Sequence, residues 1–221
     1  METIVITGAG TGLGKELALQ YAEKGNTIIL IGRRHLPLSA VREEIKQSGG
    51  KAFVYPLDIR NYAYVHTAVE EIVKNHAVTC LINNAGIGHF GPLTTLTLEQ
   101  INDMIDTNIK GTIFITKAFL PYFRSLPEAK IINIVSTAGL RGKVNESVYA
   151  ASKFAVRGFS ESLTKELENS NIAVTAVYMG GMDTPFWEDT DHIKDRSRLR
   201  SAKEVAQEII AQYNGQTEII I

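Results

Sequence analysis

Short β-branched apolar runs alternate with longer amphipathic stretches along almost the whole chain. The runs predict strands at 3–6, 27–31, 52–56, 78–82, 130–135, 172–178 and 216–221. Apolar residues at helical spacing predict helices at 12–24, 36–48, 61–75, 98–126, 147–169 and 201–213. This alternation predicts a doubly wound α/β fold of the Rossmann type, a seven-stranded, mostly parallel sheet with helices on both faces. We expect residues 1–221 to form a single domain.

Local signals mark several element boundaries. Gly25 is expected to end the first helix, because glycine tolerates positive φ. Thr97 with Gln100, and Ser201 with Glu204, have the spacing of capping boxes. The stretch 98–126 is expected to distort near 108–111. Because strand and helix alternate, the carboxyl ends of all strands should meet at one edge of the sheet, where such folds bind ligands.

Composition and charge narrow the class of protein. Hydrophobic residues make up 44% and charged residues 21%, as in average globular proteins, and the formal net charge is -1. A nearly neutral chain argues against a nucleic-acid or anionic-membrane partner. Cys80 is the single cysteine, which excludes an intrachain disulfide, and the five histidines lack the spacing of a metal ligand set. With no bilayer-length apolar run and no targeting segment recognised, we expect a cytoplasmic protein without a bound metal.

The turn between the first strand and the first helix reads Thr7-Gly-Ala-Gly-Thr-Gly-Leu-Gly14. A dinucleotide pyrophosphate requires a tight turn there, close backbone approach and a helix N-terminus aimed at the anion. The candidate residues for this role are Gly8, Thr11, Gly12, Leu13 and Gly14. The alternative is a glycine-rich turn that binds nothing.

Tyr149 and Lys153 lie four residues apart on the predicted helix 147–169, so they share a face. A phenol has a reference pKa of about 10, and a neighbouring ammonium favours phenolate, which would make Tyr149 a usable general acid or base. Ser136 ends the fifth strand at the same edge, where its hydroxyl can bond a substrate carbonyl oxygen. The alternative is an ordinary amphipathic helix, in which such pairs are common.

These motifs, with Asn83-Asn84-Ala85-Gly86 after the fourth strand, occur in the order of the short-chain dehydrogenase/reductase family. The chain resembles the smaller, non-extended branch of that family over almost its whole length. The resemblance implies hydride transfer between a nicotinamide cofactor and a substrate, with Asn108, Ser136, Tyr149 and Lys153 as the catalytic set. It also implies cofactor contacts by Tyr149, Lys153, Asp58, Ile59, Asn84, Ala85, Gly86, Gly180 and Thr184. One departure is Met179, where the family has proline.

The second strand ends Ile31-Gly32-Arg33-Arg34, with no acid to accept bonds from a ribose 2′-hydroxyl. Two guanidinium groups suit a 2′-phosphate, so we expect NADP(H) in preference to NAD(H), with Arg33 the leading contact. Alternatively, both arginines are solvated surface charges. Asp58 alternatively caps helix 61–75, and Asn84 alternatively has an architectural role.

Residues 185–200 correspond to the family's substrate loop. Phe186 and Trp187 either roof an apolar pocket or only pack the loop onto the body. His89 and Phe90 are candidates to border that pocket. The short loop favours an open site that admits varied small or medium carbonyl compounds. Its charged residues are expected to form a mixed, solvated surface: Asp189, Asp191, Lys194, Asp195, Arg196, Arg198 and Arg200.

The sequence thus favours an NADP(H)-dependent oxidoreductase acting on a carbonyl or secondary-alcohol substrate. A non-catalytic NAD(P)-binding regulator on the same fold is the alternative, and a scaffold without cofactor is a third interpretation. The resemblance implies a homodimer or homotetramer that assembles through helices 98–126 and 147–169.

Overall fold

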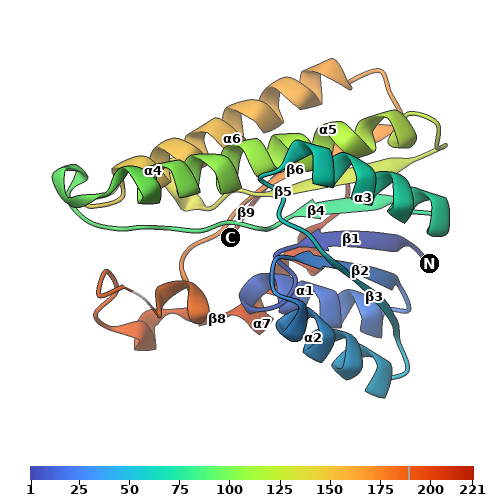
Figure 1. Cartoon of the computed structure of the whole chain (residues 1–221), viewed down its shortest axis with the longest axis horizontal. Coiled ribbons are helices and arrows are strands. Elements are labelled where there is room, and N and C mark those ends of the chain that lie inside the picture. The colour runs from blue at the N-terminus through green and yellow to red at the C-terminus, as the bar shows by residue number, and fades with distance from the viewer. Residues whose placement is uncertain (189) are drawn as a thin grey trace.

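Seven parallel strands form one sheet in the order β3-β2-β1-β4-β5-β6-β9 (Figure 1). A computed structural model describes residues 1–188 and 190–221 of the chain. The strands are β1 (Thr3–Thr7), β2 (Thr27–Gly32), β3 (Lys51–Pro56), β4 (Cys80–Asn83), β5 (Ala129–Ile134), β6 (Ile172–Tyr178) and β9 (Glu218–Ile220). The expected doubly wound Rossmann architecture is therefore confirmed.

Helices cover both faces of the sheet (Figure 1). One layer consists of α1 (Gly12–Glu23), α2 (His35–Gln47) and α7 (Ala202–Gln212), and the other of α3 (Tyr62–Asn75), α5 (Thr112–Phe123) and α6 (Ser147–Glu166). Successive strand residues point to opposite faces, so Ile4 and Ile6 pack in the first layer's core and Val5 in the second. Burial on both faces explains why the strands read as continuous apolar runs.

The predicted boundary signals are present. Thr97 and Ser201 each form a capping box, and Gly25 follows α1 with φ of 85°. The expected distortion near Asn108 is a π-helical segment, η2 (Ile105–Gly111), between α4 (Leu98–Met104) and α5. Some predicted ends shift by a few residues: α5 ends at Phe123, α6 ends at Glu166 and β4 begins at Cys80.

The strand order reverses between β1 and β4, which is the position where doubly wound folds bind ligands. The carboxyl ends of the strands lie on the left in Figure 1, on the same side as the segment that follows β6. A short parallel pair, β7 (Met182–Asp183) with β8 (Arg200–Ser201), closes the base of that segment. Within the described residues, no helix is both long and apolar enough to cross a bilayer.

Candidate active site

The glycine turn after β1 has the shape required to hold an anion. Gly8 and Gly12 have φ of 65° and 55°, and a Cβ at Gly14 would collide with the Gly8 carbonyl oxygen. Within the described residues, the Thr11 side chain makes no capping hydrogen bond to α1, and Leu13 is buried in the core. The first N–H groups of a helix lack partners inside it, so they are available to a phosphate. The turn therefore fits a dinucleotide pyrophosphate.

The end of β4 is tied to this turn by side-chain hydrogen bonds. Asn84 Nδ2 donates to the carbonyl oxygens of Thr7 and Gly8 at 3.0 and 3.3 Å. Thr7 Oγ1 accepts from the backbone N–H groups of Asn84 and Ala85, each at 3.0 Å. These bonds support the architectural interpretation of Asn84. Thr7 was not predicted as a site residue, although Thr7 is the first residue of the glycine motif.

Asp58 follows β3 and is held by an arginine from the same loop. Arg60 donates to both carboxylate oxygens of Asp58 at 2.7–3.0 Å and to Asp103 at 2.8 Å. The hydrogen bonds from Arg60 hold the pKa of the Asp58 carboxyl below its usual value. The alternative that Asp58 caps α3 is wrong, because Asn61 is the cap and accepts from the Tyr64 N–H.

Arg33 and Arg34 end β2 beside this loop and are both exposed. Within the described part of the chain neither forms an ion pair, and the charge of Arg33 contributes to the low pKa of Asp58. Both guanidinium groups therefore remain available to a further anion. Ile59 is buried and packs against Gly111 of η2, so its side chain belongs to the core.

Ser136, Tyr149 and Lys153 come together at the carboxyl edge. Ser136 leaves β5 with φ of 95°, a strained conformation for a residue with a side chain, and its Oγ accepts from the Ala138 N–H. Lys153 Nζ lies 5.8 Å from the centre of the Tyr149 ring and donates to the Ile134 carbonyl oxygen at 3.2 Å. Gly86 passes close to the same ammonium group.

Burial dominates the ionisation of this pair. It raises the pKa of Tyr149 above its usual value, the charge of Glu146 raises it further, and the Ser136 hydroxyl acts in the opposite direction. Burial also lowers the pKa of the Lys153 ammonium to about 8. Among the described groups, Lys153 does not lower the Tyr149 pKa as expected. The Lys153 ammonium lies 5.8 Å from the centre of the Tyr149 ring, and the loss of hydration on burial has the larger effect on the phenol.

The side chain of Asn108 in η2 connects three segments through hydrogen bonds. Its Oδ1 accepts from the Ile87 N–H, and its Nδ2 donates to the Ile87 carbonyl oxygen and to Ser152 Oγ, all at 2.9 Å. Ser152 Oγ in turn donates to the Tyr149 carbonyl oxygen at 2.7 Å. Ser152, which directly precedes Lys153 in the sequence, was not predicted as a site residue, yet it joins η2 to α6.

The segment after β6 approaches the glycine turn. The side chain of Thr184 lies against Gly12, whereas Gly180 is exposed with open space on its side-chain side. Met179, in the position where proline was expected, is buried, and its carbonyl oxygen accepts from the Thr137 N–H at 2.9 Å. Packing and this bond therefore hold Met179 in place.

Five aromatic side chains pack together around the Tyr149 ring, and we call them the aromatic cluster: Phe90, Tyr149, Phe186, Trp187 and His192. Phe90 meets Tyr149 edge-on at 5.3 Å, and Phe186 is 5.8 Å from Tyr149 between ring centres. Trp187 is buried and donates to the Met182 carbonyl oxygen, so it packs the loop, while Phe186 borders the phenol. The open site expected from the short loop stays a prediction.

Most of the remaining charged loop residues are exposed, as expected. His89 is partly buried, and its backbone N–H points at the Met104 sulfur. Of the charged loop residues, Arg196 is partly buried and lies 3.8 Å from Asp183, whereas the exposed ones are Asp191, Lys194, Asp195, Arg198 and Arg200. Asp189 lies outside the described residues.

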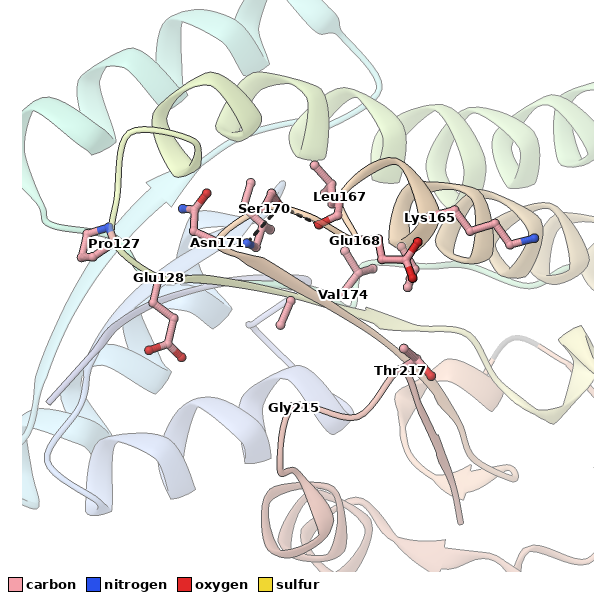
Figure 2. Close-up of a pocket in the computed structure, with 13 residues that line it drawn as sticks. Pro127, Glu128, Lys165, Leu167, Glu168, Ser170, Asn171, Val174, Gly215 and Thr217 are labelled. Atoms are coloured by element: carbon pink, nitrogen blue, oxygen red, sulfur yellow. Dashed lines mark hydrogen bonds between the residues drawn. The ribbon is translucent and has the colours of Figure 1, made fainter.

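A separate open groove of about 870 Å³ lies at the other edge of the sheet, where β5, β6 and β9 begin (Figure 2). Two of its polar side chains, those of Asn171 and Ser170, bond to backbone carbonyl oxygens. Asn171 Nδ2 donates to the carbonyl oxygens of Phe123 and Leu126, and Ser170 Oγ donates to that of Leu167. The groove therefore holds none of the candidate chemistry described above.

Known proteins share both the sequence and the geometry. The sequence model of the family described as short chain dehydrogenase matches residues 2–195. The chain is 32% identical to a 3-oxoacyl-[acyl-carrier-protein] reductase of Thermotoga maritima, over 88% of this chain and 78% of the relative.

Solved structures with either nicotinamide cofactor have the same fold. A short-chain dehydrogenase from Sphingobium yanoikuyae in complex with NADPH has a TM-score of 0.91 at 27% identity, covering 100% of this chain and 87% of that one. A 3-ketoacyl-(acyl-carrier-protein) reductase from Brucella melitensis complexed with NADH has a TM-score of 0.90 at 26% identity, covering 100% and 96%.

Proposed function

This chain belongs to the short-chain dehydrogenase family of oxidoreductases, and we propose that it transfers hydride between NADP(H) and a carbonyl or secondary-alcohol substrate. One observation carries the proposal: Ser136, Tyr149 and Lys153 gather at the carboxyl edge of the sheet, next to a glycine turn shaped for a pyrophosphate. A site that only binds a dinucleotide has no need of a proton donor in that position.

Tyr149 is the proposed general acid for reduction. Its raised pKa keeps the phenol protonated at neutral pH, so it has a proton to give to the carbonyl oxygen as negative charge develops there. The Ser136 hydroxyl donates a hydrogen bond to the same oxygen and orients it. When bound, the nicotinamide would supply the hydride for the carbonyl carbon. In oxidation the phenolate form of Tyr149 accepts the alcohol proton.

Lys153 and Asn108 support the donor. The Lys153 ammonium lies beside Gly86, where we propose that it also binds cofactor hydroxyl groups. With a pKa of about 8 it can release a proton toward Tyr149 near neutral pH, which restores the donor after each turnover. Asn108 is a positioning residue in this scheme, because it holds Ile87 and, through Ser152, the start of α6.

The proposed preference for NADP(H) rests on Arg33 at the end of β2. Its exposed guanidinium lies near enough to Asp58 to influence that carboxyl, and an arginine there matches a 2′-phosphate. In Arg33→Asp, the ratio of kcat/KM for NADPH to that for NADH is expected to fall at least tenfold, because repulsion replaces a charge-assisted bond. Arg124→Asp, a charge reversal at an exposed position after α5, is the matched control, and an unchanged ratio in Arg33→Asp would refute the assignment.

The function itself is tested with the purified chain, NADPH or NADH and a panel of aldehydes and ketones. We expect substrate-dependent loss of absorbance at 340 nm, faster with NADPH. Fluorescence titration of both cofactors is run in parallel. Cofactor binding without turnover of any carbonyl or alcohol would favour the non-catalytic regulator, and no binding of either cofactor would exclude both interpretations.

A further inference from the structure

The aromatic cluster gives the substrate side of the site a specific chemical character. The face of Phe90 is stacked on His192 at 4.6 Å with an interplanar angle of 11°, and on Trp187 at 5.0 Å with 27°. Its edge meets the Tyr149 ring at 64°. The apolar residues that pack with these rings are Ile87, Leu96, Met104, Ala138 and Val148.

A backbone feature keeps two of these rings in place. An added Cβ at Gly88 would lie 2.5 Å from Phe90 and 2.7 Å from Phe186. No side chain fits at position 88 while both rings hold this arrangement. The chain therefore passes close to Phe90 and Phe186, and these two rings border the phenol ring of Tyr149.

A side-chain hydrogen bond connects the aromatic cluster to the residue that precedes α6. His192, in the loop between β7 and β8, lies 2.9 Å from Glu146 Oε1 through its Nε2 atom. The Glu146 side chain is only 6% exposed and that of His192 17%, so the bond is largely shielded from water. Because Glu146 immediately precedes α6, which carries Tyr149, the bond fixes the loop relative to the phenol.

We propose that the aromatic cluster selects carbonyl compounds that carry a flat, apolar ring next to the reacting carbon, and that His192 is a positioning residue which holds the cluster against Tyr149. The inference rests on the hydride-transfer function proposed above. A carbonyl oxygen between Ser136 and Tyr149 brings the attached group against Phe90 and Phe186. Flat rings gain offset-stacked or edge-on contacts there that saturated rings of equal size do not make.

The test compares benzaldehyde with cyclohexanecarboxaldehyde, which have the same number of carbon atoms but differ in flatness. The measured quantity is the ratio of kcat/KM for benzaldehyde to kcat/KM for cyclohexanecarboxaldehyde, both with NADPH. Because each variant is compared with the wild type, the difference in intrinsic reactivity between the two aldehydes cancels. We expect Phe186→Leu and Phe90→Leu each to lower the ratio roughly three- to tenfold, the usual effect of one aromatic contact.

His192→Ala is expected to lower the same ratio by a similar factor, mainly through KM for benzaldehyde. Glu146→Gln should restore most of it relative to Glu146→Ala, because a glutamine oxygen still accepts from an imidazole N–H. Lys194→Gln, an exposed change in the same loop, is the matched control and should keep the ratio within twofold. Thermal melting and NADPH affinity are recorded for every variant.

A second readout does not depend on turnover. Trp187 is the only tryptophan in the chain and stacks on Phe90, so its fluorescence reports on the cluster. With NADP⁺ present, benzyl alcohol should change this emission at a lower concentration than cyclohexylmethanol does, in Tyr149→Phe as well as in the wild type.

The outcomes separate the two proposals. Reduction of neither aldehyde, nor of any other carbonyl, would refute the hydride-transfer function and this inference with it. Reduction of both with an unchanged ratio in the phenylalanine variants would refute ring selection alone. Equal losses for both aldehydes in His192→Ala would reduce His192 to a structural role and overturn its assignment as a positioning residue.

Discussion

Replacing Lys153 by methionine is expected to stabilise the fold while it removes activity. The ammonium is almost completely buried, and within the described residues its only hydrogen-bond acceptor is the Ile134 carbonyl oxygen at 3.2 Å. Burial lowers its pKa to about 8 from an ordinary 10.5. A charged group held in this way opposes folding, because the unfolded chain hydrates it better.

The magnitude follows from the two pKa values. Below about pH 8 the group is protonated in both states, and the cost of burying its charge is fully present at about 3 kcal/mol. That cost falls as the pH rises from about 8 toward the unfolded value of 10.5, and roughly 1 kcal/mol of it remains at pH 9.5. Methionine keeps most of the packing but leaves the Ile134 oxygen without this donor, which costs about 1 kcal/mol. The net gain is about 2 kcal/mol at pH 7 and near zero at pH 9.5.

Urea unfolding of the cofactor-free protein at fixed concentration measures this gain at both pH values. Lys165→Met is the matched control, because Lys165 lies on the same helix and is exposed, so its free energy of unfolding should change by less than about 0.5 kcal/mol. If Lys153→Met proves less stable than the wild type at pH 7, the ammonium has a favourable partner in the fold, and the argument from burial is refuted.

Two further substitutions test the architecture around the site. Gly14→Ala should weaken NADPH binding at least tenfold in a fluorescence titration, because the added methyl group meets the Gly8 carbonyl and the Asn84 amide; unchanged affinity would show that the turn does not hold the cofactor. Ser152→Ala removes one acceptor of Asn108 Nδ2 in a buried site, which should lower the free energy of unfolding by about 1–3 kcal/mol in thermal unfolding. It should also lower kcat more than it raises KM for NADPH. An equal change in both kinetic parameters would contradict the positioning role.

The sheet and the glycine turn were predictable because local patterns encode them. Ile4 and Ile6 face one layer and Val5 the other, so a fully buried parallel strand has to read as an unbroken apolar run. The capping boxes at Thr97 and Ser201 depend on atoms only three residues apart, so sequence spacing is sufficient to find them. The break at η2 was predictable from Asn108–Gly111, but its π-helical form was not.

The ionisation and closure of the site depend on contacts that spacing does not reveal. Tyr149 and Lys153 share a helical face, yet burial by other segments governs both pKa values. The contact between Glu146 and His192 joins residues 46 positions apart, and the Phe90 stack joins two loops with no periodic pattern. Asp58 and Asn61 are both residue types that cap helices, and in the structure Asn61 caps α3 while Asp58 accepts from Arg60. Oligomeric state and cellular location stay predictions.

The most direct test of the account compares Tyr149→Phe with the wild type in two measurements on the same preparation, NADPH affinity and the rate of carbonyl reduction. The variant lacks only the phenolic oxygen, so NADPH affinity should stay within about threefold while kcat falls by a factor of roughly 10²–10⁴, the usual contribution of a general acid. If Tyr149→Phe reduces carbonyl compounds at a rate within a few-fold of the wild type, this phenol is not the proton donor, and the proposed mechanism is wrong.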